Sequence, residues 1–208
     1  MRTFLAVLIF LVAAPVSGSK ILRVGRGDRV GTGFVIASKT TGDKHYALMI
    51  TAKHVVDTTA GNAWAKNLDK TLVAIPHSVG GSNVHVWMDG SGNDIAAFAV
   101  ETSELWKPYT IGIAEAGKVY LAYGYGSGTF KATKLKTKYR LEGTVRQGDS
   151  GGPIFNDGCQ IVGMAVEITG TGNPPVWTHT NAVEPEVIGD FAKRVLAKIK
   201  WLCPPGGT

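Results

Sequence analysis

The chain has 208 residues, of which 44% are hydrophobic and 18% are charged. These fractions exclude an intrinsically disordered chain, and the length suffices for one large domain or for two small barrels that share a cleft. The formal net charge of +6 favours acidic partners but does not by itself indicate a nucleic-acid-binding protein.

The first element is a predicted export signal over residues 1–18. A positive start at Met1-Arg2-Thr3 precedes an apolar run from Phe4 to Ala14, and Val16-Ser17-Gly18 supplies the small residues of a cleavage site. The run is too short to span a bilayer. We therefore expect a secreted or periplasmic protein without membrane contact after signal removal. The alternatives are an uncleaved anchor, a first buried strand, or a chain derived from a viral polyprotein.

Short strands separated by Gly-rich and Asn/Asp/Ser turns are predicted along the rest of the chain. They number six in each half, with a connector over residues 102–110, which favours an all-β fold of two six-stranded antiparallel barrels over residues 19–108 and 109–184. The candidates are Ile21–Gly25, Val30–Ala37, Tyr46–Thr51, Leu72–Pro76, Val84–Met88, Ile95–Val100, Lys118–Gly124, Thr129–Leu135, Thr137–Glu142, Gly152–Phe155, Cys159–Glu167 and Pro175–Asn181.

His54 follows the predicted strand Tyr46–Thr51 directly, in the stretch Thr51-Ala52-Lys53-His54-Val55. An imidazole just past a buried strand can be held rigidly, and because it titrates near neutrality it can act as a general base. Surface or packing roles are expected for the other histidines, His45, His77, His85 and His179.

Asp94 leads into the next apolar strand, in Asn93-Asp94-Ile95-Ala96. A carboxylate at this place can accept the second imidazole N–H of a catalytic histidine and fix its tautomer. The alternatives are an ordinary turn residue that begins a strand, or a rival acid at Asp89 or Asp57.

A basic strand face is predicted in the second half, where Lys134, Lys136, Lys138 and Arg140 alternate with other residues. This face could contact a polyanion or RNA. The alternative is a solvated strand face that opposes aggregation at an edge.

The pattern with the greatest specificity is Gly148-Asp149-Ser150-Gly151-Gly152-Pro153. A serine hydroxyl becomes a nucleophile when a base lies within reach and when donors hold the oxyanion that forms. Glycines on both sides permit a sharp turn, so the amides of Gly148 and Ser150 are the expected oxyanion donors. The alternative is a simple Gly-rich turn.

The last elements are a pair of cysteines and a helix. In an exported protein the even count predicts one disulfide, Cys159–Cys203, whereas two unpaired thiols are expected if the signal is absent. Pro185 followed by apolar residues at helical spacing predicts a C-terminal helix over residues 185–203.

Taken together, His54, Asp94 and Ser150 occur in the order base, acid, nucleophile. This order, with the stretches quoted above and with Gly31-Thr32-Gly33-Phe34 and Ile161-Val162-Gly163, resembles the trypsin/chymotrypsin-like serine peptidase superfamily. The resemblance covers essentially the whole mature chain. The usual vertebrate disulfide set is missing, and the compact glycine-rich strands look more like those of bacterial, HtrA-like or viral members than those of digestive enzymes.

The resemblance implies a monomeric serine endopeptidase that cleaves protein or peptide substrates through an acyl-enzyme. The alternative is a catalytically silent or polyanion-binding protein on the same scaffold. No metal motif, phosphate loop or dinucleotide fingerprint appears, so no cofactor is expected. In digestive relatives Asp149 would pair with a newly cut N-terminus, here after Lys20, but Ile21-Leu22-Arg23 matches that pattern poorly and favours another partner for Asp149.

Alignment to the family implies a specificity pocket formed by Thr144, Ala165, Glu167 and His179. A threonine floor with His179 suits Gln, Glu or a small polar side chain. A plain apolar pocket is the second reading, and a third has Glu167 attract a basic substrate residue.

Overall fold

A computed structural model gives the fold and describes residues 20–58, 63–67, 71–73, 86–126, 130–137, 141–142, 144–171 and 176–199. The predicted signal over residues 1–18 lies outside these described residues, as do Lys138, Arg140 and Cys203. Within the described part of the chain there are thirteen strands and two helices, and the all-β prediction with a C-terminal helix is confirmed.

The first sheet is built from seven described strands in the order β5-β4-β1-β2-β3-β7-β6. Its edge strand β5 also contacts β7, so the sheet curls back on itself. The sequence did not predict β4, an alternating segment that contains two alanines, which have low strand propensity. The strands are β1 (Ile21–Arg26), β2 (Arg29–Thr41), β3 (Lys44–Thr51), β4 (Ala63–Lys66), β5 (Leu72–Val73), β6 (Val86–Met88) and β7 (Ala96–Thr102).

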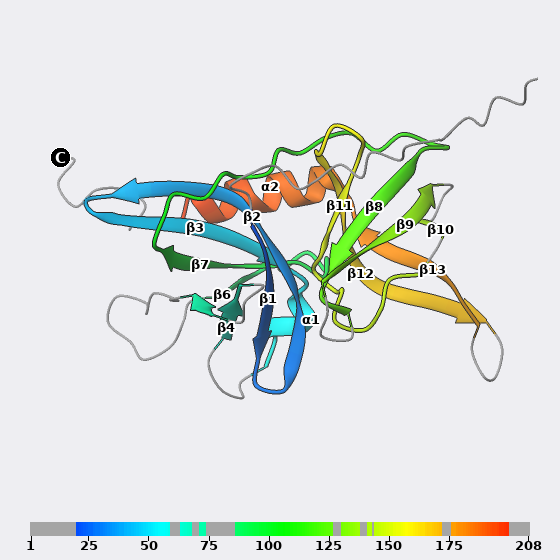
Figure 1. The fold of residues 1–208 in the computed structure, drawn as a ribbon, viewed down its shortest axis with the longest axis horizontal. Coiled ribbons are helices and arrows are strands. Elements are labelled where there is room, and N and C mark those ends of the chain that lie inside the picture. The colour runs from blue at the N-terminus through cyan, green and yellow to red at the C-terminus, as the bar shows by residue number, and fades with distance from the viewer. Residues whose placement is uncertain are drawn as a thin grey trace, which may run out of the picture.

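The second sheet is a closed six-stranded barrel in the order β10-β13-β12-β11-β8-β9. Figure 1 shows it beside the first sheet, with α1 (Lys53–Val56) near the border between the two. Its strands are β8 (Val119–Gly124), β9 (Lys131–Thr137), β10 (Leu141–Glu142), β11 (Pro153–Phe155), β12 (Ile161–Thr171) and β13 (Val176–Val183).

The C-terminal helix α2 (Pro185–Leu196) packs one face against the body of the protein. Ile188, Phe191 and Val195 are buried in the same core as the first sheet, and their spacing places them on one side of the helix. The α-helix ends before the expected residue 203, because Lys198 and Ile199 donate to carbonyls only three residues back. This tighter turn keeps Ile199 buried.

Backbone hydrogen bonds hold the two sheets together. In the connector, Tyr109 N–H donates to Val35 O of β2 at 3.1 Å, and Thr110 O accepts from Ile161 N–H of β12 at 2.8 Å. Thr32 N–H of β2 donates to Ser150 O at 2.8 Å. The last bond ties the first sheet directly to the predicted nucleophile.

Candidate active site

His54 lies in the single turn of α1, which begins directly after β3. Val55 and Val56 are buried and anchor this turn, while the His54 side chain is 49% exposed. The Arg29 guanidinium donates to His54 O at 2.7 Å and to Asp57 O at 2.8 Å, which satisfies carbonyls at the end of the helix. The backbone of the histidine is therefore held in place, while its side chain stays partly exposed.

Asp94 lies in the turn before β7 and binds His54 through both carboxylate oxygens. The His54 N–H donates to Oδ1 at 2.8 Å, and Nδ1 lies 2.5 Å from Oδ2. Burial opposes ionisation of Asp94, but these hydrogen bonds and the charge of His54 outweigh it and hold the pKa of Asp94 below its ordinary value. An ionised carboxylate only accepts, so Nδ1 carries the proton and Nε2 is left as the basic nitrogen.

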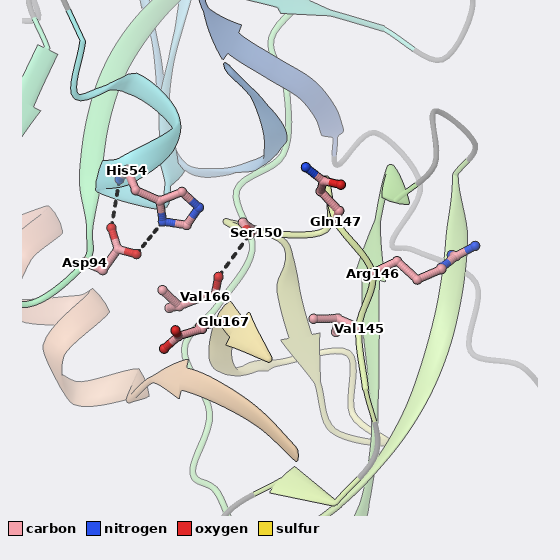
Figure 2. Close-up of a pocket in the computed structure, with 8 residues that line it drawn as sticks. All are labelled: His54, Asp94, Val145, Arg146, Gln147, Ser150, Val166 and Glu167. Carbon is pink, nitrogen blue, oxygen red and sulfur yellow. Dashed lines mark hydrogen bonds and ion pairs between the residues drawn. The ribbon is translucent and has the colours of Figure 1, made fainter. Parts of the chain in front are cut away.

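Ser150 lies at the tip of the loop between β10 and β11. Gly148 (φ +95) and Gly151 (φ +84) flank it in the left-handed region that favours glycine. In the structure Ser150 Oγ donates to Val166 O at 2.9 Å, as Figure 2 shows. The sequence did not predict this acceptor, because Val166 comes from a different strand.

The amides that were predicted to hold an oxyanion lie in the same loop. Thr32 Oγ1 donates to Gly148 O at 2.8 Å, which fixes the orientation of the peptide that follows Gly148. Within the described residues, neither the Gly148 N–H nor the Ser150 N–H donates to a protein acceptor. Both donors are therefore available to a ligand.

Asp149 is buried beneath the loop, with an exposed fraction of 3%. Its Oδ1 accepts from Gly126 N–H at 2.5 Å, and its Oδ2 accepts from Arg146 N–H at 2.7 Å. The Arg146 side chain lies 3.9 Å from Oδ2. The carboxylate thus finds its donors in the loops that follow β8 and β10, whereas Ile21 of β1 is paired with Phe34 of β2.

A cleft of about 660 Å³ joins these residues. Figure 2 shows the imidazole of His54 with Asp94 on one side and Ser150 on the other. The cleft is lined by His54, Asp94, Val145, Arg146, Gln147, Ser150, Val166 and Glu167. One cleft therefore contains a histidine, its carboxylate partner and a serine.

Of the residues expected in the specificity pocket, Glu167 lines the cleft and accepts from Asn181 Nδ2 at 3.3 Å. Ala165 is 1% exposed, and its N–H and C=O bond to Gly152 and Gly151. Its place is thus behind the serine loop. Thr144 and His179 are partly exposed and do not line this cleft, whose wall on that side is formed by Val145 and Arg146.

The predicted basic strand face and the predicted disulfide include residues that the structure describes and residues that it does not. Lys134 and Lys136 are exposed on β9, on either side of the buried Leu135. Cys159 is partly exposed, and the disulfide stays a prediction because Cys203 lies outside the described residues. No cluster of three metal-ligating side chains, and no helix long and apolar enough to cross a membrane, occurs in the part of the chain that the structure describes.

Asp89, the alternative to Asp94 as catalytic acid, is buried and paired outside the cleft. It is 5% exposed, lies before the turn that carries Asp94, and is paired with Arg194 of α2. Sequence reasoning missed this pair. The one local signal is the alternation of short polar residues in Asp89, Ser91 and Asn93, which is typical of a loop closed on a carboxylate.

Comparisons with known proteins agree with this geometry. A family model described as a trypsin-like peptidase domain matches residues 31–164. No curated protein matches the sequence of the chain.

Solved structures are similar in fold. The serine endoprotease from Yersinia pestis has a TM-score of 0.63 at 16% identity, over 85% of this chain and 62% of its own. Rv3671c from M. tuberculosis, as an inactive mutant, has a TM-score of 0.58 at 21% identity, over 89% of each chain. An inactive form of the same protease has a TM-score of 0.57 at 22% identity, over 83% of this chain and 87% of its own. At such identities the likeness shows the fold alone.

Proposed function

Because this chain belongs to the trypsin-like peptidase family, we propose that it is a serine endopeptidase with Ser150 as nucleophile, His54 as base and Asp94 as the orienting acid. The observation that carries the proposal is the pair of hydrogen bonds that His54 donates to Asp94 in a cleft that also contains Ser150. This arrangement supplies a basic Nε2 beside a hydroxyl.

The chemistry follows from these positions. Ser150 Oγ attacks the carbonyl carbon of a peptide bond while His54 Nε2 takes its proton. The oxyanion is held by the N–H groups of Gly148 and Ser150. The imidazolium then gives its proton to the leaving amine as the C–N bond breaks. Water hydrolyses the resulting acyl-enzyme by the same steps, with His54 again as base.

One observation favours a second candidate, a catalytically silent binding protein. Ser150 Oγ donates to Val166 O and not to His54 among the described residues. Under the proposal, rotation about χ1 turns the hydroxyl to Nε2 when a substrate occupies the cleft, since catalytic hydrogen bonds often tighten only in the bound complex. A silent protein would keep the hydroxyl on Val166.

Labelling with a fluorophosphonate probe tests the proposal. The wild-type protein is expected to react covalently at Ser150, and Ser150→Ala or His54→Ala should abolish labelling, since loss of either group costs about 10⁶-fold in a serine peptidase. His45→Ala is the matched control, because His45 is hydrogen-bonded to Thr40 in an exposed hairpin at the end of β3 opposite to His54. A folded wild-type protein that does not label would support the silent alternative.

Substrate preference is a finer part of the proposal. The Glu167 carboxylate lines the cleft, while Figure 2 shows Arg146 pointing away from Ser150. We therefore expect a preference for peptides with a Lys or Arg near the cleaved bond. Glu167→Gln should reduce kcat/KM for such peptides about 10-fold relative to neutral ones. A peptide library measures this ratio, with Glu186→Gln on exposed helix surface as control; an unchanged ratio contradicts the assignment.

A further inference from the structure

The turn that presents Asp94 is organised around a second carboxylate, that of Asp89. Asp89 Oδ2 accepts from the N–H and the hydroxyl of Ser91, and from the N–H and the side-chain amide of Asn93. The Asn93 bonds measure 3.3 and 2.9 Å. One carboxylate oxygen thus accepts from four donors, two on Ser91 and two on Asn93.

These contacts hold the two residues that flank Asp94 in the sequence. Asn93, the residue before it, is held by the Asp89 carboxylate. Ile95, the residue after it, accepts from the Asp89 N–H through its carbonyl at 3.1 Å. Because both neighbours of Asp94 are bound to one residue, the position of Asp94 depends on Asp89.

The other oxygen of Asp89 is bound by the C-terminal helix. Arg194 Nη2 of α2 lies 2.8 Å from Asp89 Oδ1, and the side chain of Asp89 is 4% exposed. The guanidinium also lies over the ring of Phe191, with 5.9 Å between Cζ and the ring centroid. Phe191 is part of the core, so the cation is supported by packing and not only by water-exposed charge.

The charge of Asp89 is required by this arrangement. Burial opposes its ionisation, but the hydrogen bonds from Ser91 and Asn93 outweigh burial and hold the pKa of Asp89 below its ordinary value. In the described part of the chain, the hydrogen-bond partners of its carboxylate are all donors. A neutral asparagine has one accepting oxygen, so it can serve either the turn or Arg194, and its NH₂ group must face a donor on the other side.

We propose that Asp89 and Arg194 are positioning residues for the catalytic acid, so that the C-terminal helix holds Asp94 in register with His54. Neither side chain lines the cleft, so they act through the turn and do not touch substrate. The inference rests on the proposed peptidase function. It adds a connection between the active site and an element 105 residues away in the chain.

The test uses the full mature chain and two readouts. The first is the ¹H NMR resonance of the proton between His54 Nδ1 and Asp94, which a short hydrogen bond moves far downfield and which His54→Ala identifies by its loss. The second is the rate of fluorophosphonate labelling, followed by kcat and KM once a peptide substrate is found. The resonance does not require activity, so it distinguishes failure of this inference from failure of the proposed function.

Asp89→Asn is expected to abolish or broaden the downfield resonance and to lower the labelling rate about 10- to 100-fold, as small misplacements of catalytic groups do. The loss should fall on kcat, with KM unchanged. Arg194→Gln should reduce the rate about 3- to 10-fold, and Arg194→Lys should restore part of it. If Asp89→Asn does not fold, the variants Arg194→Gln and Arg194→Lys test the inference. The Arg194 side chain is 56% exposed, so its replacement leaves the core intact.

Lys193→Gln is the matched control. Lys193 is the preceding residue of the same helix and is paired with Asp190 at 3.2 Å on the exposed surface. It should leave resonance, rate and stability unchanged. An unaltered resonance in folded Asp89→Asn protein would overturn the inference, and an unaltered resonance and rate in Arg194→Gln would overturn the part played by the helix.

Discussion

Asp94→Asn is expected to lower kcat about 10⁴-fold while leaving the fold intact, which is the effect of this change in the serine peptidase triad. An amide in place of the carboxylate can turn its NH₂ group to His54 and favour the tautomer in which Nδ1 is the acceptor. It also no longer stabilises the imidazolium. Labelling rates, or kcat with a peptide substrate, measure the loss.

The pH dependence of stability offers a second measurement on the same pair. The pKa of Asp94 is lower in the folded protein than its ordinary value. The ionised carboxylate therefore contributes its full stabilisation of the fold above the ordinary carboxyl pKa. This stabilisation is lost as the pH falls through the lower pKa of the folded state. Wild type should therefore exceed Asp94→Asn in urea midpoint at pH 7, and the difference should close below about pH 4. Asp57→Asn, at an exposed acid just after α1, serves as control.

Equal labelling rates of Asp94→Asn and wild type would show that Asp94 does not orient the base.

Gly151→Ala is expected to destabilise the protein by about 2–5 kcal/mol and to prevent labelling. Gly151 has φ +84, and a Cβ there overlaps with Thr32 O and Thr51 Oγ1 and lies 2.7 Å from Ala52 N. Thr32 and Thr51 belong to the first sheet, and Ala52 directly follows it. The serine loop must therefore move away from His54 to admit one methyl group. Urea unfolding with the labelling assay measures both effects.

Gly117→Ala separates backbone strain from close packing. Gly117 has φ +77, close to that of Gly151, but nothing lies within 4 Å of an added Cβ. Only the left-handed conformation is then disfavoured, at about 1–2 kcal/mol, and labelling should be retained. If both variants lose the same stability, the contact between the serine loop and the first sheet is weaker than the structure indicates.

Strands with local patterns were predictable from the sequence. The prediction Lys118–Gly124 lies within one residue of β8, and the start of the C-terminal helix at Pro185 was predicted from proline and apolar spacing. The extent of β2 was underestimated, because Ser38 to Thr41 are polar residues that join the sheet by pairing with β3. Pairing partners lie far along the chain, and their effect has no local signature.

In the candidate site, too, the features with a local sequence pattern were predictable and those that depend on distant residues were not. His54, Asp94 and Ser150 each stand at a strand end within a recognisable motif, and the structure brings them to one cleft. The residues that hold them were not predictable, since the Ser150 acceptor Val166 and the Asp89–Arg194 pair depend on packing between distant elements. The specificity wall was also beyond the sequence, because Thr144 and Val145 lie in the loop between β10 and β11, where no strand alternation fixes which side chain faces the cleft.

The internal donors of Asp149 bear on how such a protein would be regulated. A peptidase that waits for a new chain end keeps this carboxylate for the incoming ammonium group, whereas here Gly126 and Arg146 already occupy it. The carboxylate beneath the serine loop is thus hydrogen-bonded without a new chain end. Under the proposed function, we therefore expect the mature chain to react with a fluorophosphonate probe without a prior cut near Lys20.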